Sequence, residues 1–239
     1  MEHLRKELDS LIAKLPEQDE IRRRLASLKS RYPFNEYEYL ISTLLAMDVL
    51  TLDGYHDLRE SYVARNRYLH IFELSSQNFG GKWAENRLKR LVPELQKPSR
   101  ESDPDYSGQY DLYLDGIRIE VKASRAVDKR LRKAPLYKKA LASDSNKEFL
   151  MNFQQLKTEF CDVFVWVAVW RDIIRYWVLS SNEVATNPYY SPRQHRGNIG
   201  EGQLHMRHDN IRAFAKYKVK PQKLEYAIRM AYKRQAALR

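Results

Sequence analysis

The sequence contains very little cysteine. Cys161 is the only cysteine among the 239 residues, and it stands inside an apolar run. A single cysteine excludes an internal disulfide framework and any zinc site built from several cysteines. We therefore expect a protein that folds without covalent cross-links and works in a reducing compartment, the cytoplasm.

Long apolar runs are also missing. No stretch approaches the roughly 20 apolar residues that a membrane-spanning helix needs, and the opening residues lack the apolar segment of a signal peptide. We expect no membrane partner. Hydrophobic residues nevertheless make up 43% of the chain, which is typical of a globular protein. A chain of 239 residues can form one large domain, or a core domain with a substantial addition.

Acidic residues are the minority among the charged ones. The chain has 31 Asp and Glu against 42 Lys and Arg, which gives a formal net charge of +11. Such an excess suits a polyanionic partner such as nucleic acid, although a basic surface can also suit an anionic membrane. The net charge is therefore informative about function only together with a site that can bind phosphate.

The most informative stretch runs from Gln109 to Ser124. Two runs with alternating apolar residues, 110–114 and 117–121, flank Asp115-Gly116. This dipeptide readily takes the two positive φ angles of a type I′ turn, so the stretch predicts a tight β-hairpin. A two-residue turn also fixes which residues face each other across the two strands.

The two faces of the predicted hairpin differ sharply. Alternation places on one face Tyr110, Leu112, Leu114, Ile117, Ile119 and Val121, and on the other Asp111, Tyr113, Arg118, Glu120 and Lys122. In this register Asp111 faces Glu120 with Cβ atoms about 5 Å apart, and two such carboxylates repel each other. A divalent cation between them would turn the repulsion into a binding site. Mg²⁺ suits it, because it takes one or two protein carboxylates and leaves its other positions to water and phosphate oxygens.

The spacing of these polar residues resembles a known motif. Asp111, a gap of eight residues and then Glu120-Val121-Lys122 resemble the PD-(D/E)xK nuclease superfamily, most of whose well-known members are type II restriction endonucleases. The Glu-x-Lys half matches, whereas Tyr110 stands where the motif has proline. Pro104-Asp105 supplies that dipeptide, which leaves Asp105 as an alternative first acid, outside the predicted hairpin register.

The resemblance implies both a fold and a chemistry. The fold would be an α/β core with a mixed, restriction-endonuclease-like sheet flanked by helices. Asp111 and Glu120 would bind Mg²⁺, with the carbonyl of Val121 as a further ligand. Lys122 would orient the attacking water or help to deprotonate it.

A second acidic residue comes from the helix expected over residues 78–91. Ala84 and Leu88 belong to its predicted buried stripe, so Glu85 lies at the rim of that stripe. Similar nuclease cores often place an acidic residue of the preceding helix beside the metal, which makes Glu85 a catalytic candidate. The alternative is a surface glutamate paired with a lysine of the same helix.

Further elements complete the predicted organisation. The spacing of aromatic and leucine residues over 148–160 predicts a helix that covers the sheet, and the apolar run 161–170 predicts a strand buried on both faces. Residues 173–179 predict a returning strand. We place a helical N-terminal region, for dimerisation or DNA contact, over 1–75, and the nuclease core with a C-terminal loop and helix over 76–239.

Two segments are candidates for DNA contact. The basic stretch after the hairpin runs from Arg125 to Lys139 and could neutralise several phosphates; its selected candidates are Lys129, Arg130, Arg132 and Lys133. A later loop suits groove or phosphate contact through Tyr190, Arg193, Arg196 and Asn198. The alternative in both cases is an ordinary solvated loop.

Together these features predict a Mg²⁺-dependent, sequence-specific endonuclease that cuts double-stranded DNA, of the type II restriction kind. One such site per chain calls for a homodimer, because both strands must be cut. Two alternatives stay open: a structure-selective nuclease, such as a junction resolvase or repair enzyme, and a nucleic-acid-binding protein without catalysis.

Overall fold

A computed structural model describes residues 10, 13–14, 16–27, 36–193 and 200–237 of the chain. The chain divides into two compact units, residues 1–66 and 67–239. The sequence placed this boundary later, after residue 75.

The first unit is helical in its described residues. Its helices are α2 (Gln18–Ser27), α3 (Glu36–Ala46) and α4 (Leu52–Arg65). The side chain of Thr51 caps α4 by accepting the N–H of Gly54 at 3.0 Å. Helices α3 and α4 pack together, and a buried ion pair between Arg59 and Glu38 joins them.

The second unit is built on two sheets. The first has the strand order β1-β2-β5-β6-β9, formed by Leu112–Leu114, Ile117–Arg125, Val163–Val169, Ile174–Ser180 and Lys218–Val219. Strands β2 and β5 run parallel and the other neighbours run antiparallel, so the sheet is mixed. Every residue of β5 is buried, as the apolar run predicted.

The second sheet is antiparallel and has the order β3-β4-β8-β7. Its strands are Val127–Asp128, Phe149–Leu156, Gly202–Arg207 and Tyr190–Ser191. The helix predicted over 148–160 was therefore wrong, because β4 occupies most of it. Phe149, Met151 and Phe153 are buried at every second position, which is the period of a strand.

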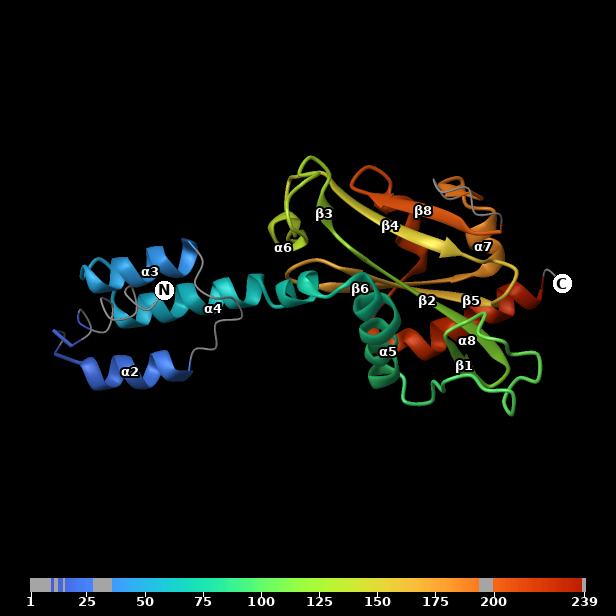
Figure 1. Cartoon of the computed structure of the whole chain (residues 1–239), viewed down its shortest axis with the longest axis horizontal. Helices are drawn as coiled ribbons and strands as arrows, with labels where there is room; N and C mark the ends of the chain where they lie inside the picture. The colour runs from blue at the N-terminus through green and yellow to red at the C-terminus, as the bar shows by residue number, and fades with distance from the viewer. Residues whose placement is uncertain (1–9, 11–12, 15, 28–35, 194–199, 238–239) are drawn as a thin grey trace. The chain divides into compact units, whose positions relative to one another are not determined.

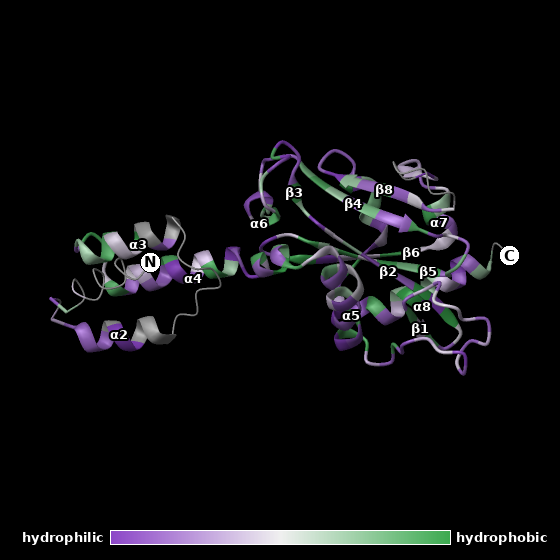
Figure 2. Cartoon of the chain, viewed as in Figure 1, coloured by the Kyte–Doolittle hydropathy of each residue, from purple (hydrophilic) through white to green (hydrophobic). Residues whose placement is uncertain are grey.

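The two sheets pack face to face, with helices on the far side of the first sheet (Figure 1). Phe164 and Trp166 of β5 share a core with the buried side chains of β4 and β8. The rings of Trp166 and Phe153 stack with centres 4.8 Å apart. Helix α8 (Leu224–Ala236) covers β5 and β6 on the opposite face. Figure 2 shows strong hydrophobic colouring along the central strands of the first sheet.

The β1–β2 hairpin has the predicted turn and register. Asp115 and Gly116 have φ values of 46° and 86°, as a type I′ turn requires. Leu112 pairs with Ile119, and the other two strand pairs follow the same register. All six apolar residues of the predicted core face are buried.

Short helices complete the second unit: η1 (Leu69–Glu73), η2 (Asn78–Ala84), α5 (Glu85–Leu91), α6 (Leu136–Lys139), α7 (Ser181–Ala185), η3 (Ile211–Tyr217) and η4 (Pro221–Lys223). Within the described ranges no helix is both long and apolar enough to span a membrane. The described residues thus form a mixed α/β protein, which confirms the predicted α/β fold class. The second sheet was not expected.

Candidate functional site

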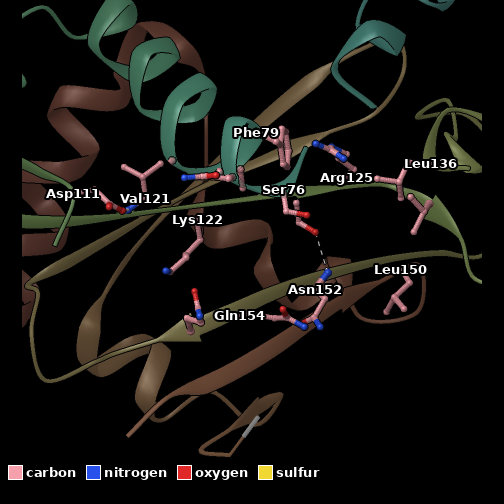
Figure 3. Close-up of a pocket in the computed structure, with 17 residues that line it drawn as sticks. Ser76, Phe79, Asp111, Val121, Lys122, Arg125, Leu136, Leu150, Asn152 and Gln154 are labelled. Carbon is pink, nitrogen blue, oxygen red and sulfur yellow. Dashed lines mark hydrogen bonds between the residues drawn. The ribbon is translucent and has the colours of Figure 1, made fainter. Parts of the chain in front are cut away.

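Strand β2 organises the candidate site. Its pairing with β1 ends at Ile119, and its later residues, 121–125, run beside an open cleft of about 790 Å³. Helix η2 and the residues just before it form one wall of this cleft, and β4 forms another (Figure 3). A hydrogen bond of 2.9 Å from the Asn152 N–H to the Ser124 hydroxyl joins β4 to β2.

Asp111 lines the cleft, but the sheet ladder ends one residue before the predicted Asp111–Glu120 pair. The Asp111 N–H donates to the carbonyl of Ile119 at 3.0 Å. Its Oδ2 accepts the N–H of Val121 at 2.8 Å. The carboxylate of Asp111 therefore takes the place of a backbone acceptor and is held against β2.

Glu120 and Lys122 form an ion pair on β2, with Lys122 Nζ 2.6 Å from Glu120 Oε1. Figure 3 shows Lys122 extending from β2 toward β4. Burial raises the pKa of Glu120 to about 7; Lys122 opposes this shift and the negative charge of Asp111 adds to it. The two carboxylates thus influence each other although they do not pair in the ladder. A cation placed between them would favour their ionised forms.

Glu85 is the first residue of α5 and is buried. Its Oε2 lies 2.8 Å from Nζ of Lys97, which also donates to the main-chain carbonyl of Asp111 at 3.4 Å. Burial raises the pKa of Glu85, and the charge of Asp111 contributes to the increase. Glu85 is therefore linked to the site through Lys97, rather than paired with a lysine of its own helix.

Lys97 belongs to this site although its sequence context gives no sign of it. Two main-chain hydrogen bonds of 2.9 Å between Gln96 and Tyr113 extend the hairpin edge by one bridge. This bridge brings Lys97 next to Asp111. No local pattern around residue 97 could have indicated it, because the pairing is tertiary.

Two carboxylates of this region could serve a cation that takes few protein ligands, such as Mg²⁺. Within the described ranges, no three His, Cys, Asp or Glu side chains are grouped so as to hold a metal ion. Mg²⁺ needs only one or two carboxylates, and Asp111 and Glu120 offer hard oxygen donors that are electrostatically coupled. The third predicted ligand is the carbonyl of Val121, on β2; the N–H of the same residue donates to the Asp111 carboxylate.

Asp105, the alternative first acid, lies elsewhere. Its side chain is 87% exposed and its Oδ2 is 3.8 Å from Arg118 Nη2. The same arginine forms a closer ion pair, of 2.8 Å, with the buried Asp103. Asp111, and not Asp105, lines the cleft.

The predicted DNA-contact residues do not line the cleft. The first group, Lys129, Arg130, Arg132 and Lys133, is exposed in the turn after β3. Lys129 and Arg130 have acidic neighbours, Glu148 at 3.9 Å and Asp128 at 3.4 Å.

In the second group, Tyr190 packs over Gly202, where no side chain would fit, and against the core between the sheets. Arg193 is exposed, and Arg196 and Asn198 lie outside the described residues.

The structure adds residues of β4 to the cleft. A bulge between Gln154 and Leu156 leaves Gln155 with a φ of 56°, so that Gln154 and Gln155 both line the cleft. Asn152 lines it as well. These amides were not predicted as site residues, because a helix was expected over this segment.

Arg125 lies on strand β2, apart from the exposed basic residues 129–133. Arg125 is the last residue of β2, it is buried, and it lines the cleft with Phe79. Its guanidinium carbon lies 4.0 Å from the centre of the Phe79 ring.

Comparison of the chain with models of protein families and with curated proteins finds no match.

Proposed function

We propose that this chain is a Mg²⁺-dependent endonuclease that hydrolyses phosphodiester bonds in double-stranded DNA. The observation that carries the proposal is the contact between the buried Glu120 and Lys122 on β2, beside a cleft that Lys122 and Asp111 line. An acid pair that can hold a hard cation, with a lysine at its side, is suited to phosphate chemistry.

Each residue has a role in this proposal. Asp111 and Glu120 hold Mg²⁺, with the Val121 carbonyl as a further ligand. Bound Mg²⁺ supplies positive charge against the phosphate and a water of lowered pKa. Lys122 stabilises the negative charge that develops on the phosphate and orients the attacking water.

Glu85 acts as a positioning residue in this proposal. Its carboxylate holds Lys97, and Lys97 holds the main chain of Asp111. The chain of contacts fixes Asp111 before substrate arrives. Such preorganisation matters because small displacements of a reacting group cost large factors in rate.

We favour a sequence-specific enzyme of the restriction type, built on a nuclease-like core. The chain carries a separate helical unit before the core, and such an addition is more useful for reading sequence than for recognising a nick or junction. Two copies of the chain would cut the two strands, which makes a homodimer the expected form.

The deciding experiment is digestion of a supercoiled mixed-sequence plasmid with Mg²⁺. Discrete fragments support a sequence-specific nuclease, cuts only at cruciforms or branched substrates support a structure-selective one, and retardation without cutting supports a binding protein. In the first two cases Lys122→Ala should lower the cleavage rate by a factor on the order of 10² or more.

The matched control is Lys147→Ala. Lys147 also pairs with a buried carboxylate, that of Asp128 at 3.7 Å, but it does not line the cleft. Its removal should leave cleavage unchanged. Wild-type cleavage by Lys122→Ala would contradict the proposal.

A further inference from the structure

Arg125 is a buried cation without an acidic partner. Only 7% of its surface is exposed. Its Nη2 donates to the carbonyl of Leu74 at 2.7 Å, and its guanidinium lies over Phe79. Among the described residues no carboxylate pairs with it, and its buried Nε makes no hydrogen bond. Burial lowers the pKa of Arg125 to about 10.

The buried arginine of the first unit, Arg59, has the acidic partner that Arg125 lacks. Arg59 is 2% exposed and is paired with Glu38, a carboxylate from the neighbouring helix. Buried charges are normally compensated in this way, because a low-dielectric interior does not solvate them. The carbonyl and the aromatic ring at Arg125 orient the guanidinium, but they carry no negative charge to neutralise it.

The position of Arg125 indicates where a neutralising anion would come from. Figure 3 shows Arg125 and Asp111 toward opposite ends of the cleft. Lys122 lies three residues before Arg125 on β2. A strand rises about 3.3 Å per residue, so the two residues are offset by roughly 10 Å along β2, and their side chains leave the strand on opposite faces. Lys122 extends toward β4 and Arg125 lies over Phe79 of η2, and both line the cleft. If the axis of a DNA duplex ran along β2, this offset would correspond to about three nucleotide steps, which rise about 3.4 Å each along that axis.

The lining of the cleft mixes polar and apolar side chains, and away from Asp111 its charged residues are positive. Asp111, Lys122 and Arg125 are the charged side chains that line it in the described part of the chain. The amides of Asn152 and Gln154 extend the wall on the β4 side. Amides and guanidinium groups can donate to phosphate oxygens and to base edges.

We propose that Arg125 binds a phosphate group of the substrate strand, on a different nucleotide from the one that is cut. The strand then lies along β2 with one phosphate at Lys122 and another at Arg125. This inference rests on the proposed function and adds to it a phosphate-binding residue that fixes the direction and position of the strand. A free phosphate or a mononucleotide presents the same chemistry, so the test must separate these sources.

The test measures binding of a fluorescent DNA duplex to the full chain in Ca²⁺, over a series of salt concentrations. Arg125→Met keeps an unbranched apolar side chain over Phe79 but removes the charge. We expect the affinity to fall by roughly tenfold, and the slope of log K against log salt to become shallower by about 0.9, the value for one lost phosphate contact. Arg125→Lys should restore part of both.

Arg175→Met is the matched control. Arg175 lies 4.7 Å from the centre of the Trp170 ring but outside the cleft lining. Its removal should leave the slope unchanged. Thermal unfolding is measured beside binding, and Arg125→Met should not lower the melting temperature, because it removes an uncompensated buried charge. A lower melting temperature with an unchanged slope would show that Arg125 is structural and would overturn the inference.

Competition separates the possible sources of phosphate. Inorganic phosphate and a mononucleotide are each added to the duplex complex of the wild type and of Arg125→Met. If Arg125→Met loses only the response to these small anions and binds duplex normally, the site is for free phosphate and the inference is wrong. Failure of the wild type to bind duplex would contradict the proposed function as well, whereas an unchanged Arg125→Met beside an active wild type would contradict the Arg125 inference alone.

Discussion

At the hairpin end of the cleft, buried carboxylates are already matched by lysines. Glu120 has Lys122 at 2.6 Å and Glu85 has Lys97 at 2.8 Å. At the far end of β2, Arg125 has a carbonyl and an aromatic ring but no acid. A cation that enters the first end must compete with lysines of the chain, whereas an anion that enters the second end meets an uncompensated charge. Under the proposed function, the far end would bind a phosphate of the substrate, and a metal cation at the near end would replace lysines as the partner of the carboxylates.

The largest expected effect concerns the identity of the first acid at the hairpin end. Asp111→Asn keeps an oxygen that can accept the Val121 N–H but removes the charge that binds the cation. We expect plasmid cleavage with Mg²⁺ to fall by a factor on the order of 10² or more. Asp105→Asn is the matched control, because Asp105 is exposed beside Arg118 and does not line the cleft. Equal losses in the two variants would remove the distinction between these acids.

A smaller effect is expected at Lys97, which acts on the site through Asp111. Lys97→Met leaves Glu85 buried without its partner and releases the Asp111 carbonyl. We expect kcat to fall by roughly tenfold with little change in duplex affinity, because positioning and not substrate contact is lost. Lys97→Arg should recover most of the rate. A loss that appears only in affinity would mean that Lys97 contacts DNA directly.

A third prediction uses the pH dependence of stability. The pKa of Glu120 is raised from 4.5 to about 7, so the folded state holds its proton more tightly than the unfolded state does. Below about 4.5 both states are protonated and stability is unaffected; stability falls as pH rises from 4.5 through 7, and the penalty is complete above 7.

Thermal unfolding in EDTA checks this prediction. Glu120→Gln should melt a few degrees higher than the wild type at pH 8 and close to the wild type at pH 5. Added Mg²⁺ should raise the melting temperature of the wild type at pH 8 more than that of Glu120→Gln. A difference between the two proteins that does not change with pH would show that Glu120 has an ordinary pKa.

The smallest effect is expected from the exposed basic loop. Neutralising Lys129, Arg130, Arg132 and Lys133 together should flatten the salt dependence of duplex binding and leave cleavage at low salt nearly unchanged. Lys129 and Arg130 already have acidic neighbours, so the slope should change by less than four phosphate contacts would require. An unchanged slope would show that this loop does not touch phosphate, and Arg125 would then remain the phosphate-binding candidate on this side of the cleft.

Local patterns predicted the hairpin and the central strand well. Asp115-Gly116 has few conformations other than a tight turn, and the continuous apolar run of β5 suits a strand buried on both faces. Strand β4 was missed because a spacing of four between Phe149 and Phe153 fits both a helix and a strand. Met151 between them carried the missing signal.

The sequence indicated several residues of the candidate site but not how they are arranged. A regular ladder would place Asp111 opposite Glu120, but the chain leaves the ladder at Asp111, next to Tyr110, whose hydroxyl donates to Asp103 at 2.7 Å. Such a contact has no signature in the local sequence. Lys97 was missed as a site residue for the same reason. Arg125 stood out only as the first residue of the basic stretch, because its distinct position depends on burial.

The hydrogen bond from the Val121 N–H to the Asp111 carboxylate gives the site a built-in reporter. The acceptor of this bond is also a proposed cation ligand. The exchange rate of the Val121 amide hydrogen therefore depends on whether the carboxylate keeps this hydrogen bond when a cation binds. Divalent cations that draw the carboxylate away from β2 would speed hydrogen–deuterium exchange at Val121, and those that fix it in place would slow exchange. The occupancy of the site can therefore be followed at a single amide, without DNA and without turnover.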